Sequence, residues 1–129
     1  MKRMRIEVAQ ELDAQGDLEE FTWDLLPVVD PQQTRHLDEN GLPRIGTPIS
    51  AGMILVGKLG KSSAFNESEQ PSSLEIQGLP FSALQARYGH LWKDGSSYAT
   101  EELHGTVENA HFEKVNGKLH AIVELARKE

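Results

Sequence analysis

The run Gly-Lys-Leu-Gly-Lys-Ser at residues 57–62 has the residue types of a phosphate-binding loop. Such a loop needs a further glycine five residues before its Gly-Lys-Ser triplet, so that backbone amides can surround a phosphate. Here that position is Leu55, and no helical pattern follows Ser62. We therefore expect strand-end glycines and solvated lysines here, and no nucleotide site.

A second group with chemical potential is His111, Glu113 and His120, which would share one face of a β-hairpin. Imidazole and carboxylate together can bind zinc or nickel. The hairpin pattern assigns this face to solvent or to a neighbouring sheet, where polar cross-strand pairs are the usual arrangement. We predict no metal and no cofactor, and keep a small metal-dependent enzyme as an alternative that elemental analysis would decide.

Other catalytic constellations are weak. The acidic pairs Asp38-Glu39, Glu67/Glu69 and Glu101-Glu102 fall in turns or loops, without the unequal environments that acid–base catalysis requires. No Gly-x-Ser-x-Gly elbow presents a serine nucleophile, and the chain has no cysteine. The residues indicate a protein that is noncatalytic by itself.

Composition limits the class of partner. With 13 Lys and Arg against 20 Asp and Glu, the 129-residue chain carries a net charge of −7. This charge disfavours autonomous nucleic-acid binding and favours a protein partner with a basic surface. The absence of cysteine, of a signal-peptide core and of a membrane-length apolar run predicts an unprocessed cytoplasmic protein.

The elements that would position these residues are mainly β-strands. Residues 4–11 alternate like a half-covered strand, and the apolar run 53–59 is the best candidate for a buried central strand. Gly105–Val115 and Lys118–Ala126 flank Asn116-Gly117, a pair that favours a two-residue hairpin turn. This turn would place Phe112 opposite Ala121 and Glu113 opposite His120. The face bearing Phe112, Leu119, Ala121, Val123 and Leu125 would then be the core face.

Helices are expected to be short. The acidic residues 17–21 are compatible with one short helix, and Asp30-Pro31 with a capped helix reaching Leu37. The residues Asp38 to Gly41 predict a tight turn. The sequence thus predicts one domain over residues 1–129, a small β barrel or barrel-sandwich hybrid with minor helix.

One excursion, at about residues 60–103, interrupts this β framework. Its first part, 60–73, has the polar composition of a mobile loop, and a helix follows from about Leu79 to Tyr88, with Gly89 able to end it in the left-handed conformation. An apolar helix between two polar loops is either a cap on the barrel or an exposed patch for a partner. The candidate partner-binding residues are Leu79, Phe81, Leu84, Arg87, Tyr88, Leu91 and Trp92.

Three motifs carry a resemblance to a known family. Residues 37–46 and 52–58 contain Leu-Asp-Glu-Asn-Gly, Ile-Gly and Gly-Met-Ile-Leu-Val-Gly-Lys, and Gly105-Thr106-Val107 follows. In order and spacing they resemble the flap segment of the bacterial DNA-directed RNA polymerase β subunit. The similarity covers nearly the whole chain, although Met53 replaces an acidic residue of the family pattern.

The resemblance implies a noncatalytic role in transcription. In that family the excursion is the flap, whose apolar tip helix is contacted by region 4 of sigma factors and by elongation and termination factors. The tip pattern falls on residues 83–89, where Ala83 replaces a leucine and Arg87 an apolar residue. The resemblance is compatible with an excised segment, a segment of a split subunit, or a free-standing mimic that competes for flap-binding factors.

A carrier domain of the biotinyl or lipoyl type is the alternative from another class. Its barrel-sandwich layout is similar, and it displays a modified lysine at a hairpin tip. Lys118 stands beside the Asn116-Gly117 tip but lacks the usual flanking residues of such a site. Intact mass from the native host would show an attached cofactor.

Overall fold

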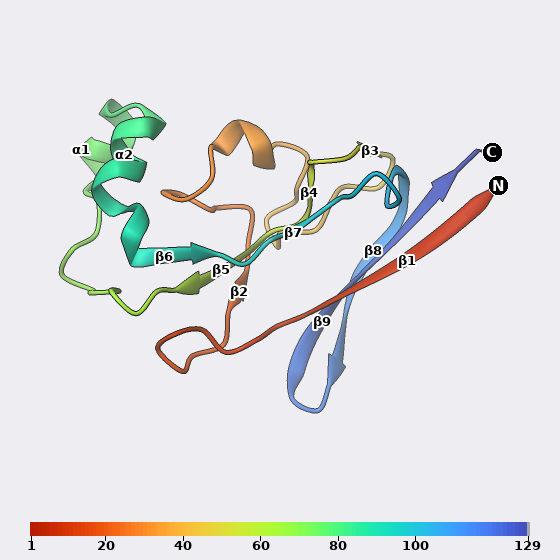
Figure 1. Cartoon of the computed structure of the whole chain (residues 1–129), viewed down its shortest axis with the longest axis horizontal. Helices are drawn as coiled ribbons and strands as arrows, with labels where there is room; N and C mark the ends of the chain where they lie inside the picture. The colour runs from red at the N-terminus through yellow and green to blue at the C-terminus, as the bar shows by residue number, and fades with distance from the viewer. Residues whose placement is uncertain (129) are drawn as a thin grey trace.

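The C-terminal hairpin organises the largest sheet of the computed structural model, which describes residues 1–128 (Figure 1). Strands β8 (Gly105–Val115) and β9 (Lys118–Arg127) meet at Asn116 and Gly117, whose φ angles are 51° and 81°. Positive φ at both positions is what a type I′ turn requires. The register pairs Phe112 with Ala121, so the predicted hairpin is confirmed.

Strand β1 (Lys2–Ala9) extends this hairpin into a four-stranded sheet in the order β1-β9-β8-β3. β1 runs antiparallel to β9, and the two-residue β3 (Pro48–Ile49) pairs with the start of β8. The sheet curls into a half-barrel within a mostly β fold, which confirms the predicted fold class.

The concave face of this sheet forms the larger core. Ala121, Val123 and Leu125 are buried there, and Phe112 is half-buried, as the alternation predicts. Leu119, near the hairpin tip, remains 37% exposed. Ile122 is also buried although it lies on the opposite face, flanked by its pairing partners Glu7 and His111.

The predicted central strand is two strands, β4 (Ile54–Val56) and β5 (Lys58–Lys61), separated at Gly57. β4 pairs with β7 (Ser97–Tyr98), whereas β5 lies between β2 (Glu20–Phe21) and β6 (Trp92–Asp94) in a three-stranded sheet. The chain crosses the Thr22 backbone at Gly57, where any Cβ would overlap the Thr22 carbonyl oxygen. Burial of the run was predicted correctly, but its continuity was not.

The segment 17–21 is not helical. It ends in strand β2 (Glu20–Phe21), which pairs with Lys58 and Leu59 of β5. Five residues offer too few hydrogen bonds to offset helix nucleation, and β5 supplies partners instead.

The helix expected after Asp30 exists as a single 3₁₀ turn, η1 (Pro31–Thr34). Asp30 caps it by accepting a hydrogen bond from the Gln32 amide, as predicted. It ends before Leu37, where the chain bends into the Asp38–Gly41 turn.

The β framework outside the excursion is here called the base. The excursion leaves it on β5 and returns on β6 (Trp92–Asp94), and these two strands pair from Leu59–Asp94 to Lys61–Trp92. Between them lie α1 (Ser73–Gly78), α2 (Phe81–Tyr88) and the 3₁₀ turn η2 (Gly89–Leu91). Figure 1 shows both helices at the end of the molecule opposite the two termini. The expected helix is therefore present as α2, and α1 is an addition to it.

Two details of the excursion differ from expectation. Gly89 has φ −60°, so the chain continues from α2 into η2 without a left-handed residue. The segment predicted to be loop from residue 60 begins as paired strand and is irregular only between β5 and α1. No helix within residues 1–128 is long and apolar enough to cross a membrane.

Candidate docking site on the helical excursion

The paired strands β5 and β6, from which the excursion extends, are here called the stem. A buried ion pair of Lys58 holds β5 in place. Lys58 Nζ lies 2.9 Å from Glu19 Oε1, with side-chain exposures of 8% and 14%. The same ammonium group donates to the Ala9 carbonyl oxygen at 2.9 Å, and Glu19 accepts from the Glu11 amide at 3.0 Å. Lys58 is thus a buried structural residue, and the prediction of a solvated lysine was wrong for this position.

Glu75 joins the two helices. It accepts hydrogen bonds from the Tyr88 hydroxyl at 2.7 and 2.8 Å and from Arg87 Nη1 at 3.0 Å. It also closes a capping box with Ser72 at the start of α1. The Tyr88 hydrogen bond, followed by that from the Ser72 amide, lowers the pKa of Glu75 to about 2. Two of the predicted partner-binding residues, Arg87 and Tyr88, are therefore held together by one carboxylate.

The structure divides the other predicted contact residues by burial. Leu84 and Leu91 are 3% and 0% exposed, so neither offers its side chain to a partner in this conformation. Leu79, Phe81 and Tyr88 are half-buried, and Arg87 is exposed. Trp92 meets the Phe65 ring edge-on, with ring centroids 4.8 Å apart. It also packs against a second, smaller core made of Leu25, Val29, Leu37, Ile54 and Leu59.

The most exposed apolar side chains of the excursion belong to α1. Leu74 is 82% exposed and Ile76 46% exposed. Neither residue was among the predicted contact residues, because the predicted loop ended at residue 73 and the predicted helix began only at about Leu79. The available signal was the spacing of Ser72 and Glu75, which is that of a capping box.

A groove separates α1 from the β base. Its volume is about 300 Å³. Its apolar lining consists of Leu26, Pro27, Leu59, Pro71, Ile76 and Trp92. Ile76 of α1 lines this groove, whereas Leu74 does not.

Lowering the pH should loosen the helix pair through Glu75. Because its folded-state pKa is about 2 against an ordinary 4.5, the carboxylate stabilises the fold fully above about pH 4.5, and this contribution is lost as the pH falls toward 2. Replacing Tyr88 by Phe should raise the titration midpoint of Glu75 toward 4.5, measured from its side-chain carboxyl resonance by NMR. Tyr98→Phe is the control, since that hydroxyl bonds Asp94; an unchanged Glu75 midpoint in Tyr88→Phe would contradict the assignment.

The two histidines of the hairpin have different surroundings. His111 Nε2 lies 3.2 Å from Glu113 Oε2, and Arg5 Nη2 occupies the same carboxylate oxygen at 3.0 Å. His120 Nδ1 lies 3.8 Å from Glu7 Oε2 and is buried without a hydrogen-bond partner among the residues that the structure describes. Within residues 1–128, no group of three or more His, Asp or Glu side chains has the geometry to hold a metal ion.

Comparison with known proteins agrees with the motifs. Residues 2–128 match the family model described as RNA polymerase Rpb2, domain 6. Over 93 residues, 70% of the chain, the sequence is 39% identical to the DNA-directed RNA polymerase subunit beta of Porphyromonas gingivalis. The match covers 6% of that subunit's length. With almost its entire length matched, the chain belongs to the RNA polymerase Rpb2 domain 6 family.

Proposed function

We propose that this chain acts in transcription as a noncatalytic, flap-like docking module of an RNA polymerase β subunit. Its family membership supports the polymerase context over the carrier-domain and metal-enzyme alternatives. The observation that carries the docking role is the α1–α2 pair, which is held at the end of a paired stem and carries an exposed Leu74. Contiguous exposed apolar patches on soluble domains tend to mark protein-binding surfaces, and the groove lined by Ile76 and Trp92 adds apolar area at this end of the molecule.

The proposed contact surface, here called the tip surface, combines exposed and half-buried residues. It consists of Leu74, Ile76, Leu79, Phe81, Arg87 and Tyr88. Leu84 and Leu91 are buried and Trp92 packs on a hydrophobic core cluster, so their replacement would act through the fold. Glu75 fixes Arg87 and Tyr88 in place, which reduces the entropy lost on binding.

The proposed partners are region 4 of a sigma factor or an elongation or termination factor, together with the rest of the polymerase. The net charge of −7 suits a partner surface rich in Lys and Arg. The proposed location is the cytoplasm. The alternative is a free-standing mimic that competes for flap-binding factors. A competition experiment distinguishes the two, because a mimic should inhibit the binding of such a factor to an intact polymerase.

Replacing Leu74 and Ile76 together by Ser tests the tip surface. Each exposed apolar anchor is expected to contribute about 1–3 kcal/mol to binding, so the double change should weaken binding of a sigma region 4 fragment by at least about tenfold. Isothermal titration calorimetry measures the affinity, and circular dichroism confirms that the fold is kept.

The matched control is Ile45→Ser. Ile45 is 70% exposed but lies outside the excursion, so its change should leave binding unaltered. The tip surface would be excluded as the contact site if both variants lost the same affinity for the sigma region 4 fragment, or if the double variant lost none.

A further inference from the structure

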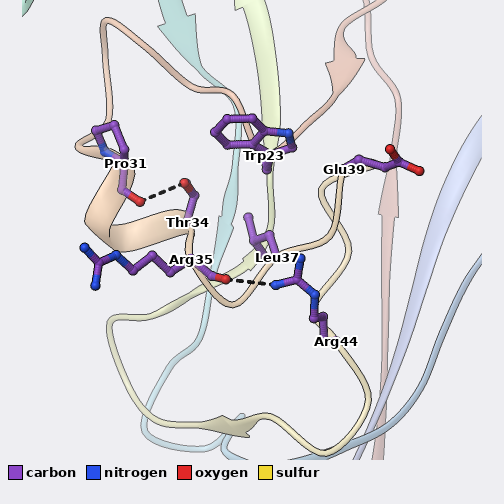
Figure 2. Close-up of a pocket in the computed structure, with 7 residues that line it drawn as sticks. All are labelled: Trp23, Pro31, Thr34, Arg35, Leu37, Glu39 and Arg44. Atoms are coloured by element: carbon purple, nitrogen blue, oxygen red, sulfur yellow. Dashed lines mark hydrogen bonds between the residues drawn. The ribbon is translucent and has the colours of Figure 1, made fainter. Parts of the chain in front are cut away.

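A second hollow lies on the base, away from the helical excursion (Figure 2). Its volume is about 270 Å³. All of its lining residues come from one continuous stretch: Trp23, Pro31, Thr34, Arg35, Leu37, Glu39 and Arg44. None of them belongs to the tip surface, so this hollow, here called the Trp23 pocket, is a separate site.

The Trp23 pocket combines an aromatic wall, an apolar floor and a cation. Trp23 is 44% exposed, while Leu37 beneath it is only 3% exposed. Figure 2 shows the Arg44 guanidinium beside Leu37 and below the Trp23 ring, whereas the Arg35 guanidinium points away along the other side of η1. Trp and Arg are the residue types that most often dominate protein-binding sites.

This geometry is fixed before any ligand arrives. Arg44 Nη1 donates to the Arg35 carbonyl oxygen at 3.0 Å, and the Arg44 amide donates to the His36 carbonyl oxygen at 3.0 Å. The Thr22 amide bonds the Gly57 carbonyl oxygen at 3.1 Å and so holds the backbone next to Trp23. A preorganised pocket loses little entropy on binding.

Within the described part of the chain, the two arginines of the pocket make no ion pair, unlike Arg3, Arg5 and Arg87. Arg3, Arg5 and Arg87 each lie within 3.2 Å of a carboxylate oxygen. Arg127 contacts the His104 ring at 3.0 Å. Over residues 1–128, neither Arg35 nor Arg44 has a carboxylate within 4.0 Å, although acidic residues outnumber basic ones by 7. Arg44 thus keeps guanidinium N–H donors for an incoming anion.

We infer that the Trp23 pocket binds a segment of a protein partner that carries one carboxylate next to an apolar side chain, with the carboxylate on Arg44 and the apolar side chain on Trp23 and Leu37. A carboxylate matches the planar guanidinium through charge-assisted hydrogen bonds. A phosphate backbone fits less well, because Glu39 lines the same pocket and the whole chain is acidic. A single carboxylate meets less of this repulsion than a run of phosphates.

The test uses the whole chain and two short peptides, one with Glu next to Phe and one with Gln in place of that Glu. The indole N–H resonance of Trp23, resolved by NMR, reports binding, and that of Trp92 is the internal reference. The Glu peptide should shift Trp23 and leave Trp92 unchanged, and the Gln peptide should bind about tenfold more weakly, the loss expected for one hydrogen bond to a charged group.

Variants of the protein show how much each side chain of the pocket contributes to binding of the Glu peptide. Arg44→Gln should weaken binding of the Glu peptide about tenfold and Arg35→Gln by much less, since its guanidinium points away. Glu39→Gln should tighten it by removing a like charge. Arg3→Gln, which removes a residue already paired with Glu108, is the matched control and should change nothing.

Three results would overturn the inference. They are no Trp23 shift at millimolar peptide, equal binding of the Glu and Gln peptides, and a stronger Trp23 shift with a single-stranded RNA oligonucleotide than with the Glu peptide. The peptide comparison leaves the protein unaltered, so it remains decisive even if Arg44→Gln fails to fold. Because Leu74 and Ile76 lie outside this pocket, the Ser variants of the tip surface should retain peptide binding, which separates this inference from the docking proposal.

Discussion

Replacing Lys58 by Met should lower the free energy of unfolding by about 3–5 kcal/mol, the usual cost of leaving one member of a buried ion pair without its partner. Glu19, 14% exposed, would keep its charge with no ammonium group beside it. The Ala9 carbonyl oxygen would lose its side-chain donor as well. Urea unfolding followed by circular dichroism measures the change.

Lys61→Met is the matched control for this prediction. Lys61 pairs with Asp17 at 3.1 Å, but the side chains are 33% and 61% exposed, so its loss should cost no more than about 1 kcal/mol. The double variant Lys58→Met/Glu19→Met should recover much of the stability, because it removes both buried charges. If Lys58→Met costs no more than Lys61→Met, the ion pair does not anchor the stem.

Gly57→Ala should lower the free energy of unfolding by a similar amount, for a steric reason. A methyl group at Gly57 would overlap the Thr22 carbonyl oxygen and would lie 3.1 Å from Leu37 Cδ1. The obstacle is backbone that also hydrogen-bonds Gly57, so it cannot rotate away as a flexible side chain would. We expect a loss of about 3 kcal/mol or more, or failure to fold, seen in urea unfolding and in soluble yield.

Gly78→Ala is the corresponding control. No atom lies within 4 Å of a Cβ at Gly78, which ends α1, and its φ is not positive. The alanine should therefore leave the free energy of unfolding unchanged or raise it by about 0.4–1 kcal/mol, because alanine lowers the conformational entropy of the unfolded chain. If Gly57→Ala and Gly78→Ala change the free energy of unfolding by similar amounts, the chain can pass the Thr22 backbone at position 57 with a side chain present.

Local signals predicted local structure well. Asn116 and Gly117 specify the hairpin turn by their own conformational preferences, and the register of β8 and β9 follows from it. Asp30 and Pro31 likewise specify the start of η1. In each case the decisive interactions are between residues close in sequence.

Features that depend on distant contacts were not predicted. The two residues of β2 form a strand because β5 pairs with them, which no pattern in residues 17–21 indicates. Lys58 looks like any strand-end lysine until Glu19 and Ala9 are placed beside it. For the tip, the apolar spacing located α2 but could not show that Leu84 faces inward while Leu74 faces solvent.

The pairing of Lys61 with Trp92 means that the excursion begins and ends at neighbouring points of the base. Lengthening, trimming or exchanging the segment between them leaves those two attachment points where they are, as at other exposed loop tips that accept insertions. A change in the helices is therefore compatible with an unchanged half-barrel. The same property makes this base a scaffold on which foreign helical hairpins can be grafted.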